Sequence, residues 1–406
     1  MRVGHYVYGL NVPGGVRTYV LELAAAQRRR GHAVTVCDHV AQQGAGIPDG
    51  WDVTFLRDRD HLRQVVADRR LDVLHTHHNL PVGFLDAPAS VPLVRTLHGH
   101  SPYCPSGSRF LARRGAPCMR TYSPLGCLWG HVADHCGSVR PLRFAQEYRE
   151  RAAEANFLPG VPTLVVSDFL KREMTRAGYP AARIHVLYLP VWERLQAPPA
   201  PLAAGDPAFL FLGRLVPAKG VWWLLRAFAA VPRPARLEIA GDGFLAADLR
   251  REAARLGLEG RVRFHGWVEP GRARQLLEAS TALVVPSVWH EPSGTVALEA
   301  AAAGRAVVAS DAGGLPEYVR DGHTGLVVPA GDVPGMTAAL RRLMEEPGTA
   351  ARLGSAGRAR ALSAFDAGGH LATVERVYRE AMQGGPDHAT AGAGEGRAGT
   401  AAARPS

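Results

Sequence analysis

Residues 285–314 read VPSVWHEPSGTVALEAAAAGRAVVASDAGG and decide the fold of this chain. An apolar strand ends near Ser287, a loop of Pro, Ser and Gly follows, and an alanine-rich helical pattern begins near Thr295. A second apolar run, Ala306–Ser310, follows that helix. This order of strand, helix and strand is typical of a parallel sheet covered by helices.

The start of this helix carries groups suited to a phosphorylated ligand. Its first backbone N–H groups form a site for an anion, with Ser293 or Thr295 as the expected side-chain cap. Glu299 lies about one turn inside the helix, where its carboxylate can accept hydrogen bonds from two neighbouring ribose hydroxyls. Glu291 precedes the helix and can reach hydroxyls of whatever lies beyond the phosphates. We therefore expect a ligand-binding loop here.

A second candidate motif is the sequence FLFLGRLVPAKG at residues 209–220. Gly213 ends an apolar strand and lets the backbone pass close to a ligand. Arg214 and Lys219 can clamp a diphosphate between them. Isolated cations are more often surface charges, but their place beside a strand-end glycine favours a binding role.

The alternation of short apolar strands and helical patterns occurs twice, which predicts two Rossmann-like α/β domains. Strands are expected in the first half at Arg2–Val7, Ala33–Cys37, Asp72–His77, Pro92–Gly99 and Thr163–Ser167. In the second half they are expected at Phe209–Leu215, Arg236–Ala240, Arg261–Phe264, Ala282–Pro286, Ala306–Ser310 and Gly325–Val328, with helices including Leu245–Leu256 and Arg272–Ala279. Ligands of such doubly wound sheets bind at the carboxyl ends of the strands, so the site should lie in the cleft between the domains.

The domain boundaries follow from composition. A Pro- and Ala-rich stretch at 196–207 supports neither helix nor central strand and is expected to be a linker. We predict an N-terminal domain at 1–195 with an insertion at 101–140, a second domain at 208–365, a helix at 366–384 that crosses back to the first domain, and a disordered tail at 385–406.

Length, charge and hydropathy limit the class of protein. The chain has 406 residues, 47% of them hydrophobic, enough for two cores. No apolar run reaches the length of a membrane span and no signal-peptide pattern opens the chain, so a cytoplasmic protein is expected, with peripheral contact at the inner membrane face as an alternative. The net charge of +10 suits anionic partners, but no nucleic-acid motif is present.

These motifs together resemble the donor signature of the retaining glycosyltransferases of the GT-B fold, glycosyltransferase family four. The resemblance rests on Glu291 and Glu299, eight residues apart, in Glu-Pro-x-Gly followed by Leu-Glu-Ala and a later Gly-Gly-x-Pro-Glu. It extends over nearly the whole ordered chain. Ser293 stands where many relatives carry Phe, which leaves the polarity of the donor pocket open.

The resemblance implies a role for each motif residue. Glu291 would contact the donor sugar, Glu299 the nucleotide ribose, and Arg214 and Lys219 the donor phosphates, in place of a catalytic metal. The other residues expected around the nucleotide are Gly14, Gly15, Gly213, Val268, Ser293, Gly294 and Thr295. The family also places a sugar-binding histidine at the position of His98, at a strand end. His75 and His77 are candidates for the acceptor side or for a structural role.

Four of the five cysteines, Cys104, Cys118, Cys127 and Cys136, cluster in the insertion. Their spacing lacks the C-x-x-C pairs of common zinc modules, although an irregular loop can still close a tetrahedral zinc site. A structural zinc, disulfides and free thiols remain open alternatives; a reducing cytosol disfavours disulfides. Cys37 lies in an apolar strand and is expected to be a buried thiol.

The sequence therefore predicts a retaining, metal-independent hexosyl transfer from a UDP- or GDP-linked sugar. The acceptor hydroxyl would belong to a glycan, a lipid-linked carrier or a small molecule, in polysaccharide, glycolipid or glycoside biosynthesis. A sugar-nucleotide epimerase of the same fold and a non-catalytic sugar-nucleotide-binding subunit are the alternatives. A dehydrogenase is disfavoured, because the dinucleotide fingerprint is absent.

Overall fold

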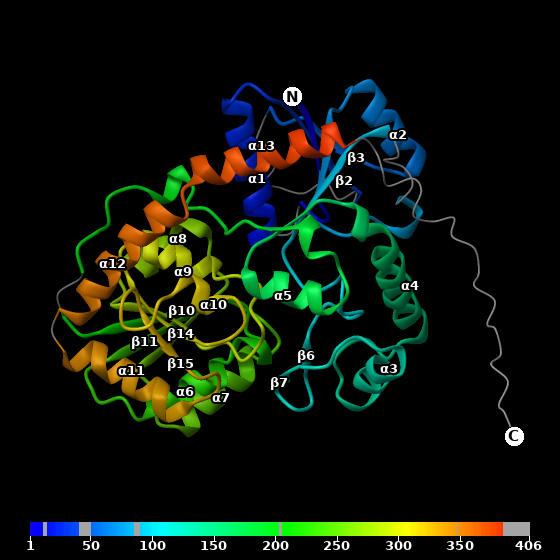
Figure 1. The fold of residues 1–406 in the computed structure, drawn as a ribbon. Helices are drawn as coiled ribbons and strands as arrows, with labels where there is room; N and C mark the ends of the chain where they lie inside the picture. Colours follow the sequence, from blue (N-terminus) through cyan, green and yellow to red (C-terminus); the bar gives the residue numbers. More distant parts are fainter. Residues whose placement is uncertain (11–13, 40–49, 85–89, 203–204, 347, 385–406) are drawn as a thin grey trace, which may run out of the picture.

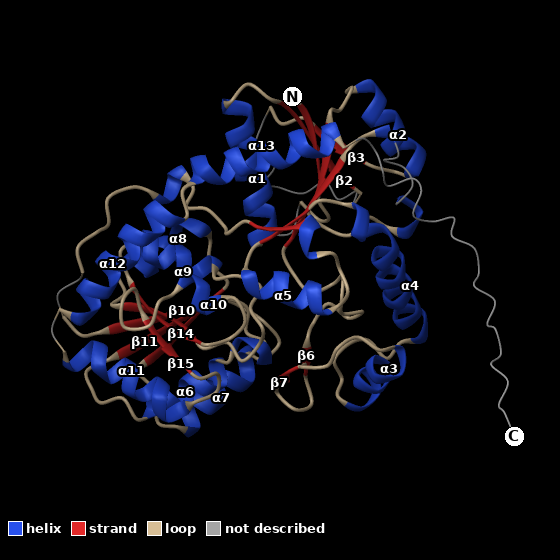
Figure 2. Ribbon diagram, viewed as in Figure 1, coloured by secondary structure: helices blue, strands red, loops and turns tan. Residues whose placement is uncertain are grey.

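The computed structural model describes residues 1–10, 14–39, 50–84, 90–202, 205–346 and 348–384. The predicted disordered tail at 385–406 lies outside the described residues. Figure 1 shows two α/β halves side by side, and Figure 2 shows helices on both faces of each sheet. This layered arrangement confirms the predicted fold class.

The first sheet has seven parallel strands in the order β3-β2-β1-β4-β5-β8-β9. The strands are β1 (Arg2–Tyr6), β2 (Ala33–Asp38), β3 (Val53–Phe55), β4 (Val73–Thr76), β5 (Leu93–Leu97), β8 (Thr163–Val165) and β9 (Ile184–Val186). All five predicted strands are confirmed. The sequence analysis missed β3 and β9, because three-residue edge strands are too short to show periodicity.

The second sheet has six parallel strands in the order β12-β11-β10-β13-β14-β15. They are β10 (Ala208–Leu212), β11 (Arg236–Ala240), β12 (Val262–Gly266), β13 (Ala282–Val285), β14 (Ala306–Ser310) and β15 (Leu326–Val328), and all six were predicted. In each sheet the chain first adds strands on one side of its first strand and then on the other. This switch in strand order lies between β1 and β4 in the first sheet and between β10 and β13 in the second. Doubly wound sheets bind ligands at the carboxyl edge of such points.

Helices connect the strands and cover the sheets. In the first half they are α1 (Gly15–Arg29), α2 (Arg59–Asp68), α4 (Pro141–Phe157) and α5 (Asp168–Arg176). In the second half they are α6 (Val221–Ala229), α7 (Ala246–Arg255), α8 (Pro270–Glu278), α9 (Thr295–Ala302), α10 (Leu315–Tyr318), α11 (Val333–Glu345) and α12 (Thr349–Ala364). The predicted helices at 245–256 and 272–279 correspond to α7 and α8. Side-chain caps fix several starts: Asp58 for α2, Ser167 for α5 and Asp332 for α11.

The last described helix, α13 (Ala367–Gln383), returns from the second half and lies beside α1 of the first (Figure 1). Its start is capped by Asp366. Tyr378 and His370 on α13 are buried against the first sheet, where the Tyr378 hydroxyl lies 2.6 Å from His75 Nδ1. The helix therefore contributes to the core of the N-terminal half although it is the last element in the sequence.

The insertion between β5 and α4 is a small unit of its own. It contains a hairpin of two-residue strands, β6 (Phe110–Leu111) and β7 (Ala116–Pro117), and the helix α3 (Pro124–Ala133). Figure 1 shows it beside the second half of the molecule, below α4 and α5.

Candidate active site

An ion pair joins the loops that follow β10 and β13. Lys219 Nζ lies 2.6 Å from Glu291 Oε1, and the Ser287 hydroxyl donates to the same oxygen. The side chain of Glu291 is only 8% exposed, so its negative charge depends on these two partners. The structure thus brings together two predicted site residues, Lys219 and Glu291, at the carboxyl edge of the second sheet.

Glycines allow these loops to meet. Gly220 has a φ of +70°, and a Cβ there would lie 1.8 Å from the carbonyl oxygen of Pro286. On the other side of the Glu291 loop, a Cβ at Gly313 would lie 2.4 Å from Glu291 O, and Gly314 N donates to that oxygen at 2.7 Å. The Gly-Gly motif therefore holds the backbone of Glu291 in place.

The start of α9 carries no side-chain cap. Gly294 occupies the N-cap position, so the expected cap by Ser293 or Thr295 is wrong. Ser293 lies one residue too early and Thr295 is already inside the helix; their hydroxyls lie 3.4 Å from each other instead. The first N–H groups of α9 are thereby left without a side-chain partner, the arrangement that suits a phosphate.

Glu299 lies one turn inside α9, as predicted, and pairs with a residue that the sequence analysis missed. Arg194 Nη2 lies 3.6 Å from Glu299 Oε1, and its Nε donates to Glu22 at 2.6 Å. Burial raises the pKa of Glu299, while Arg194 acts in the opposite direction. No local motif marks Arg194, which lies in the 3-10 turn Glu193–Leu195 well after the end of β9.

Arg214 is exposed and has no hydrogen-bond or ion-pair partner among the described residues. Gly213 before it has a φ of +155°, and a Cβ at Gly241 would lie 1.8 Å from Gly213 O. The two strand-end turns are thus in direct backbone contact. Val268, just beyond β12, is half-buried. These residues leave the Arg214 guanidinium free to turn toward a ligand.

The amino end of α1 provides a second uncapped helix start. Gly14 is its N-cap without a side-chain hydrogen bond, and a Cβ at Gly14 or Gly15 would meet nothing within 4 Å. Both glycines are exposed. The glycines therefore leave no side chain at the start of α1, and residues 11–13 before it lie outside the described residues.

His98 directly follows β5, and its ring lies edge-on to Tyr19 at 4.9 Å. Burial lowers the pKa of His98 to about 3, so the ring is neutral near pH 7. Its Nε2 lies 3.5 Å from His77 Nδ1. A neutral imidazole has one donor and one acceptor nitrogen, and its neighbours decide which is which.

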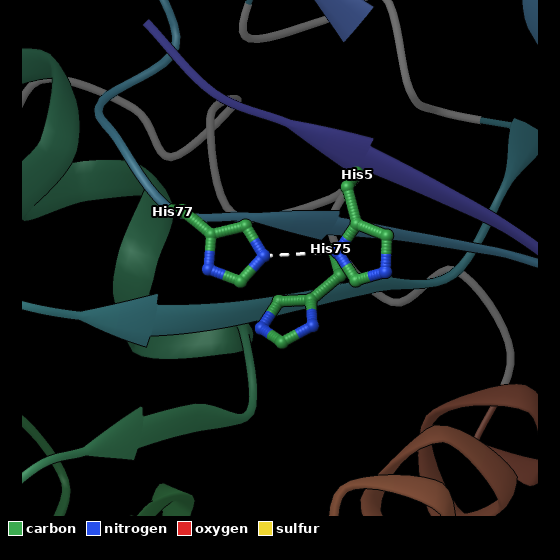
Figure 3. A group of neighbouring side chains, drawn as sticks. All are labelled: His5, His75 and His77. Carbon is green, nitrogen blue, oxygen red and sulfur yellow. Dashed lines mark hydrogen bonds between the residues drawn. The ribbon is translucent and has the colours of Figure 1, made fainter. Parts of the chain in front are cut away.

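Three buried histidine rings, those of His5, His75 and His77, lie together (Figure 3), and His77 is the one next to His98. His5 Nδ1 lies 2.9 Å from His77 Nε2, and His5 Nε2 lies 2.7 Å from the amide oxygen of Gln27. Because that oxygen only accepts, His5 donates from Nε2 and its Nδ1 is an acceptor. His77 therefore donates to it from Nε2, which leaves His77 Nδ1 as an acceptor. His98 then donates from Nε2, which leaves its Nδ1 as a hydrogen-bond acceptor.

His75 and His77 are buried, which contradicts an acceptor-binding role for them. His75 bonds the Tyr378 hydroxyl at 2.6 Å and Thr96 Oγ1 at 2.7 Å. His5, His75 and His77 bring three ligand nitrogens within 4.8 Å of one another. The nitrogens of His5 and His75 are already hydrogen-bonded, so these side chains are satisfied without an ion.

None of the five cysteines forms a disulfide in this structure, which speaks against the disulfide alternative for the four clustered ones. Cys37 is buried in β2, as predicted. The other four line one cavity in the insertion.

Comparison with known proteins identifies the family. The model for "Glycosyl transferases group 1" matches residues 195–360, and the model for "Glycosyltransferase Family 4" matches residues 13–191. The phosphatidyl-myo-inositol mannosyltransferase of Mycolicibacterium smegmatis is 30% identical over 374 residues, which cover 85% of each chain. This chain belongs to the group 1 glycosyltransferases.

Other relatives of this glycosyltransferase match over different lengths. Glycogen synthase of Mycobacterium tuberculosis is 38% identical over 186 residues, so the chain spans 44% of that relative's length. Among solved structures, HepE of Anabaena in complex with UDP has a TM-score of 0.72 at 21% identity, covering 94% of this chain and all of that one. The fold is therefore that of the GT-B enzymes.

The glycosyltransferase chain also makes contacts between its two halves that sequence reasoning missed. Glu317, the acid of the Gly-Gly-x-Pro-Glu motif, accepts from the backbone N–H groups of Asp168 and Phe169, each at 2.7 Å, at the start of α5. The Ser167 hydroxyl donates to Pro292 O at 2.6 Å. The motif was recognised, but only the structure shows that its glutamate binds the N-terminal half.

No helix in the described part of the chain is long and apolar enough to cross a bilayer.

Proposed function

We propose that this protein is a retaining glycosyltransferase that moves a hexose from a UDP- or GDP-linked donor to an acceptor hydroxyl. The observation that carries the proposal is the Lys219–Glu291 pair beside the uncapped start of α9. It puts a cation, a set of free N–H groups and a buried carboxylate at one sheet edge. A sugar diphosphate presents the complementary groups: anionic phosphates followed by a polyhydroxyl ring.

The donor is proposed to bind along this edge. Its diphosphate would contact the N–H groups at 294–295, Arg214 and Lys219, and Glu299 would accept from the ribose hydroxyls. The exposed, unpartnered state of Arg214 supports this, because binding breaks no ion pair. The UDP complexes of the structurally similar HepE support a uridine nucleotide among the candidates.

We propose front-face substitution as the chemical step. The bond from the anomeric carbon to the phosphate oxygen breaks, the acceptor oxygen bonds the same face, and its proton passes to the departing phosphate oxygen. Arg214 and Lys219 would stabilise the charge that grows on the diphosphate, so no divalent metal is required. Glu291 would accept from a sugar hydroxyl, and His98 would accept another at Nδ1, the nitrogen that its neighbours leave as an acceptor.

A screen of nucleotide sugars by thermal shift, followed by product analysis, tests this function. A true donor should raise Tm in proportion to the logarithm of its concentration above Kd. Transfer to an acceptor with the anomeric configuration kept supports the proposal. Conversion of the donor to an epimer without acceptor would show an epimerase, and tight binding without any turnover would show a silent subunit.

We further propose that the protein is cytoplasmic and that its acceptor is carried by a lipid or a growing glycan at an anionic membrane. The helix α3 would dock on the surface of that membrane. Leu125, Leu128, Trp129 and Val132 follow helical spacing on one face of α3, and all four are exposed, Leu125 to 80%. Val139 and Leu142, in the segment that follows α3, are exposed as well. Such a surface is unusual on a protein that contacts only water.

The charge around this surface favours an anionic bilayer as its partner. Residues 101–150 contain 7 Arg and no Lys against 3 acidic residues, a net charge of +4. Arg140 and Arg143, both exposed, lie two residues before and one residue after Leu142. Apolar side chains that enter the headgroup region beside arginines are typical of interfacial helices. The mannosyltransferase relatives, whose names specify a phosphatidyl-inositol, support a lipid acceptor.

Co-sedimentation with vesicles tests the docking surface. Wild-type protein should bind vesicles of phosphatidylglycerol and phosphatidylcholine, and Leu125→Glu with Trp129→Glu should reduce binding by about tenfold. Phe244→Glu, which replaces an equally exposed aromatic in the other half, should bind like wild type. Equal binding by both variants, or none by the wild type, would contradict the proposal.

A further inference from the structure

The insertion at 101–140 has little regular secondary structure and a small apolar core, formed by Tyr103, Phe110 and Leu111. Its hairpin strands are two residues long, and the apolar side chains of α3 face outward rather than into a core. A unit of this size normally needs disulfides or a metal to be stable. It has no disulfide.

Four thiols from four separate segments converge inside this unit. Cys104 lies after β5, Cys118 directly after β7, Cys127 within α3, and Cys136 just after α3. All four line one cavity. Four cysteines from separate segments around one cavity are the ligand types that a structural zinc site uses.

Two arginines, Arg109 and Arg120, line the same cavity. Each is also paired with a carboxylate, Arg109 with Glu173 and Arg120 with Asp134, so they would offset only part of the −2 charge of a zinc ion with four thiolates. A Cβ at Gly130 would lie 3.0 Å from Arg120 Nη1 and 3.2 Å from Cys136 Sγ, so the glycine leaves room for the guanidinium beside the sulfur. The Arg109 Nε is buried without a hydrogen-bond partner.

We propose that the insertion binds one structural zinc ion through four thiolates, those of Cys104, Cys118, Cys127 and Cys136. Each thiol gives up its proton to solvent on binding. Among the described residues, the three histidines of Figure 3 are the one group of three or more such side chains whose ligand atoms lie within 4.8 Å of one another. The sulfurs must therefore draw together into the cavity to reach Zn–S distances of about 2.3 Å.

The proposed zinc would hold one wall of the active-site cleft. The indole N–H of Trp289 donates to Ser108 O within the insertion, and His290 Nε2 lies 3.2 Å from Met119 Sδ. Trp289 and His290 directly precede Glu291. The ion would thus order the surface on which the Glu291 loop rests, as well as the exposed helix α3. This second consequence rests on the proposed function, but zinc binding itself does not.

Metal analysis of protein purified without added metal tests the site directly. We expect about one zinc per chain, released when a mercurial reagent titrates the thiols, and protection of the four cysteines from alkylation in native protein. Cys118→Ser and Cys136→Ser should lose the zinc and lower Tm, whereas Cys118→His should retain it, because imidazole is also a zinc ligand. Cys37→Ser, in β2, is the matched control and should keep one equivalent.

The outcomes separate the zinc proposal from the proposed function. Four readily alkylated thiols without bound metal, a disulfide found by mass spectrometry, or the visible absorption of an iron–sulfur cluster would overturn the zinc site. None of these measurements depends on donor binding. If zinc is present but no nucleotide sugar binds, the proposed function fails and the zinc site stands.

Discussion

Lys219→Met removes the cation of the buried pair and keeps most of the side-chain volume. At 2.6 Å and an effective dielectric constant of about 20, the attraction between Lys219 and Glu291 is about 6 kcal/mol, most of it offset by the loss of hydration. Breaking a buried pair costs about 3–5 kcal/mol. Because the Lys219 side chain is still 23% exposed, we expect the lower end, a loss of about 3 kcal/mol in the free energy of unfolding.

Two further variants distinguish the effect of leaving one charge unpaired from the effect of losing a charged side chain. Lys219→Met with Glu291→Gln removes both charges and should recover about 2 kcal/mol, because no unpaired carboxylate stays buried. Arg214→Met is the control: it is exposed without a partner among the described residues, so stability should stay within about 0.5 kcal/mol. Urea unfolding at pH 7.5, followed by tryptophan fluorescence, measures all four proteins.

Turnover should follow a different pattern from stability. If both cations stabilise the departing diphosphate, Lys219→Met and Arg214→Met should each lower kcat by about a hundredfold or more and weaken donor affinity less. Mg²⁺ or EDTA should leave wild-type turnover nearly unchanged. If Lys219→Met has the same free energy of unfolding as the wild type, the stabilising role of the Lys219–Glu291 pair is refuted. A strict metal requirement with near-normal rates in both variants would refute the proposed mechanism.

The remaining predictions concern single side chains. Glu299→Ala should weaken UDP or GDP binding measured by calorimetry, whereas Glu291→Ala should chiefly lower kcat; changes of less than about twofold in both would remove them from the donor site. Gly220→Ala should cost more than about 2 kcal/mol in unfolding by urea, because a Cβ would strike Pro286 O at a φ of +70°, while Gly14→Ala, with open space around it, should be nearly neutral. The protein should also lose stability below pH 6.5: burial lowers the pKa of His5 to about 4, so the unfolded chain binds its proton first, and each such histidine costs about 2 kcal/mol at pH 5. Unfolding curves that coincide at pH 7.5 and pH 5 would contradict this.

Local sequence was sufficient for most of the fold. The strands before Gly213 and Ser287 and the helix from Thr295 were predicted because apolar periodicity, glycine and proline act within a few residues of one another. The same locality explains the errors. β3 and β9 are too short to have a period, and the N-cap of α9 depends on the backbone angles of Gly294, which its neighbours Ser293 and Thr295 do not reveal.

The sequence by itself determined the two α/β halves, the motif residues at the carboxyl edges of their strands, and a cluster of four cysteines. Only the tertiary structure decided which of these residues meet. Lys219 and Glu291 are 72 positions apart in the sequence, and Tyr378 and His75, which share a hydrogen bond, are 303 positions apart. Such pairs leave no local pattern, because their geometry depends on how two sheets and α13 pack. For the same reason, only the folded chain shows that four thiols share one cavity and that the apolar face of α3 is left uncovered.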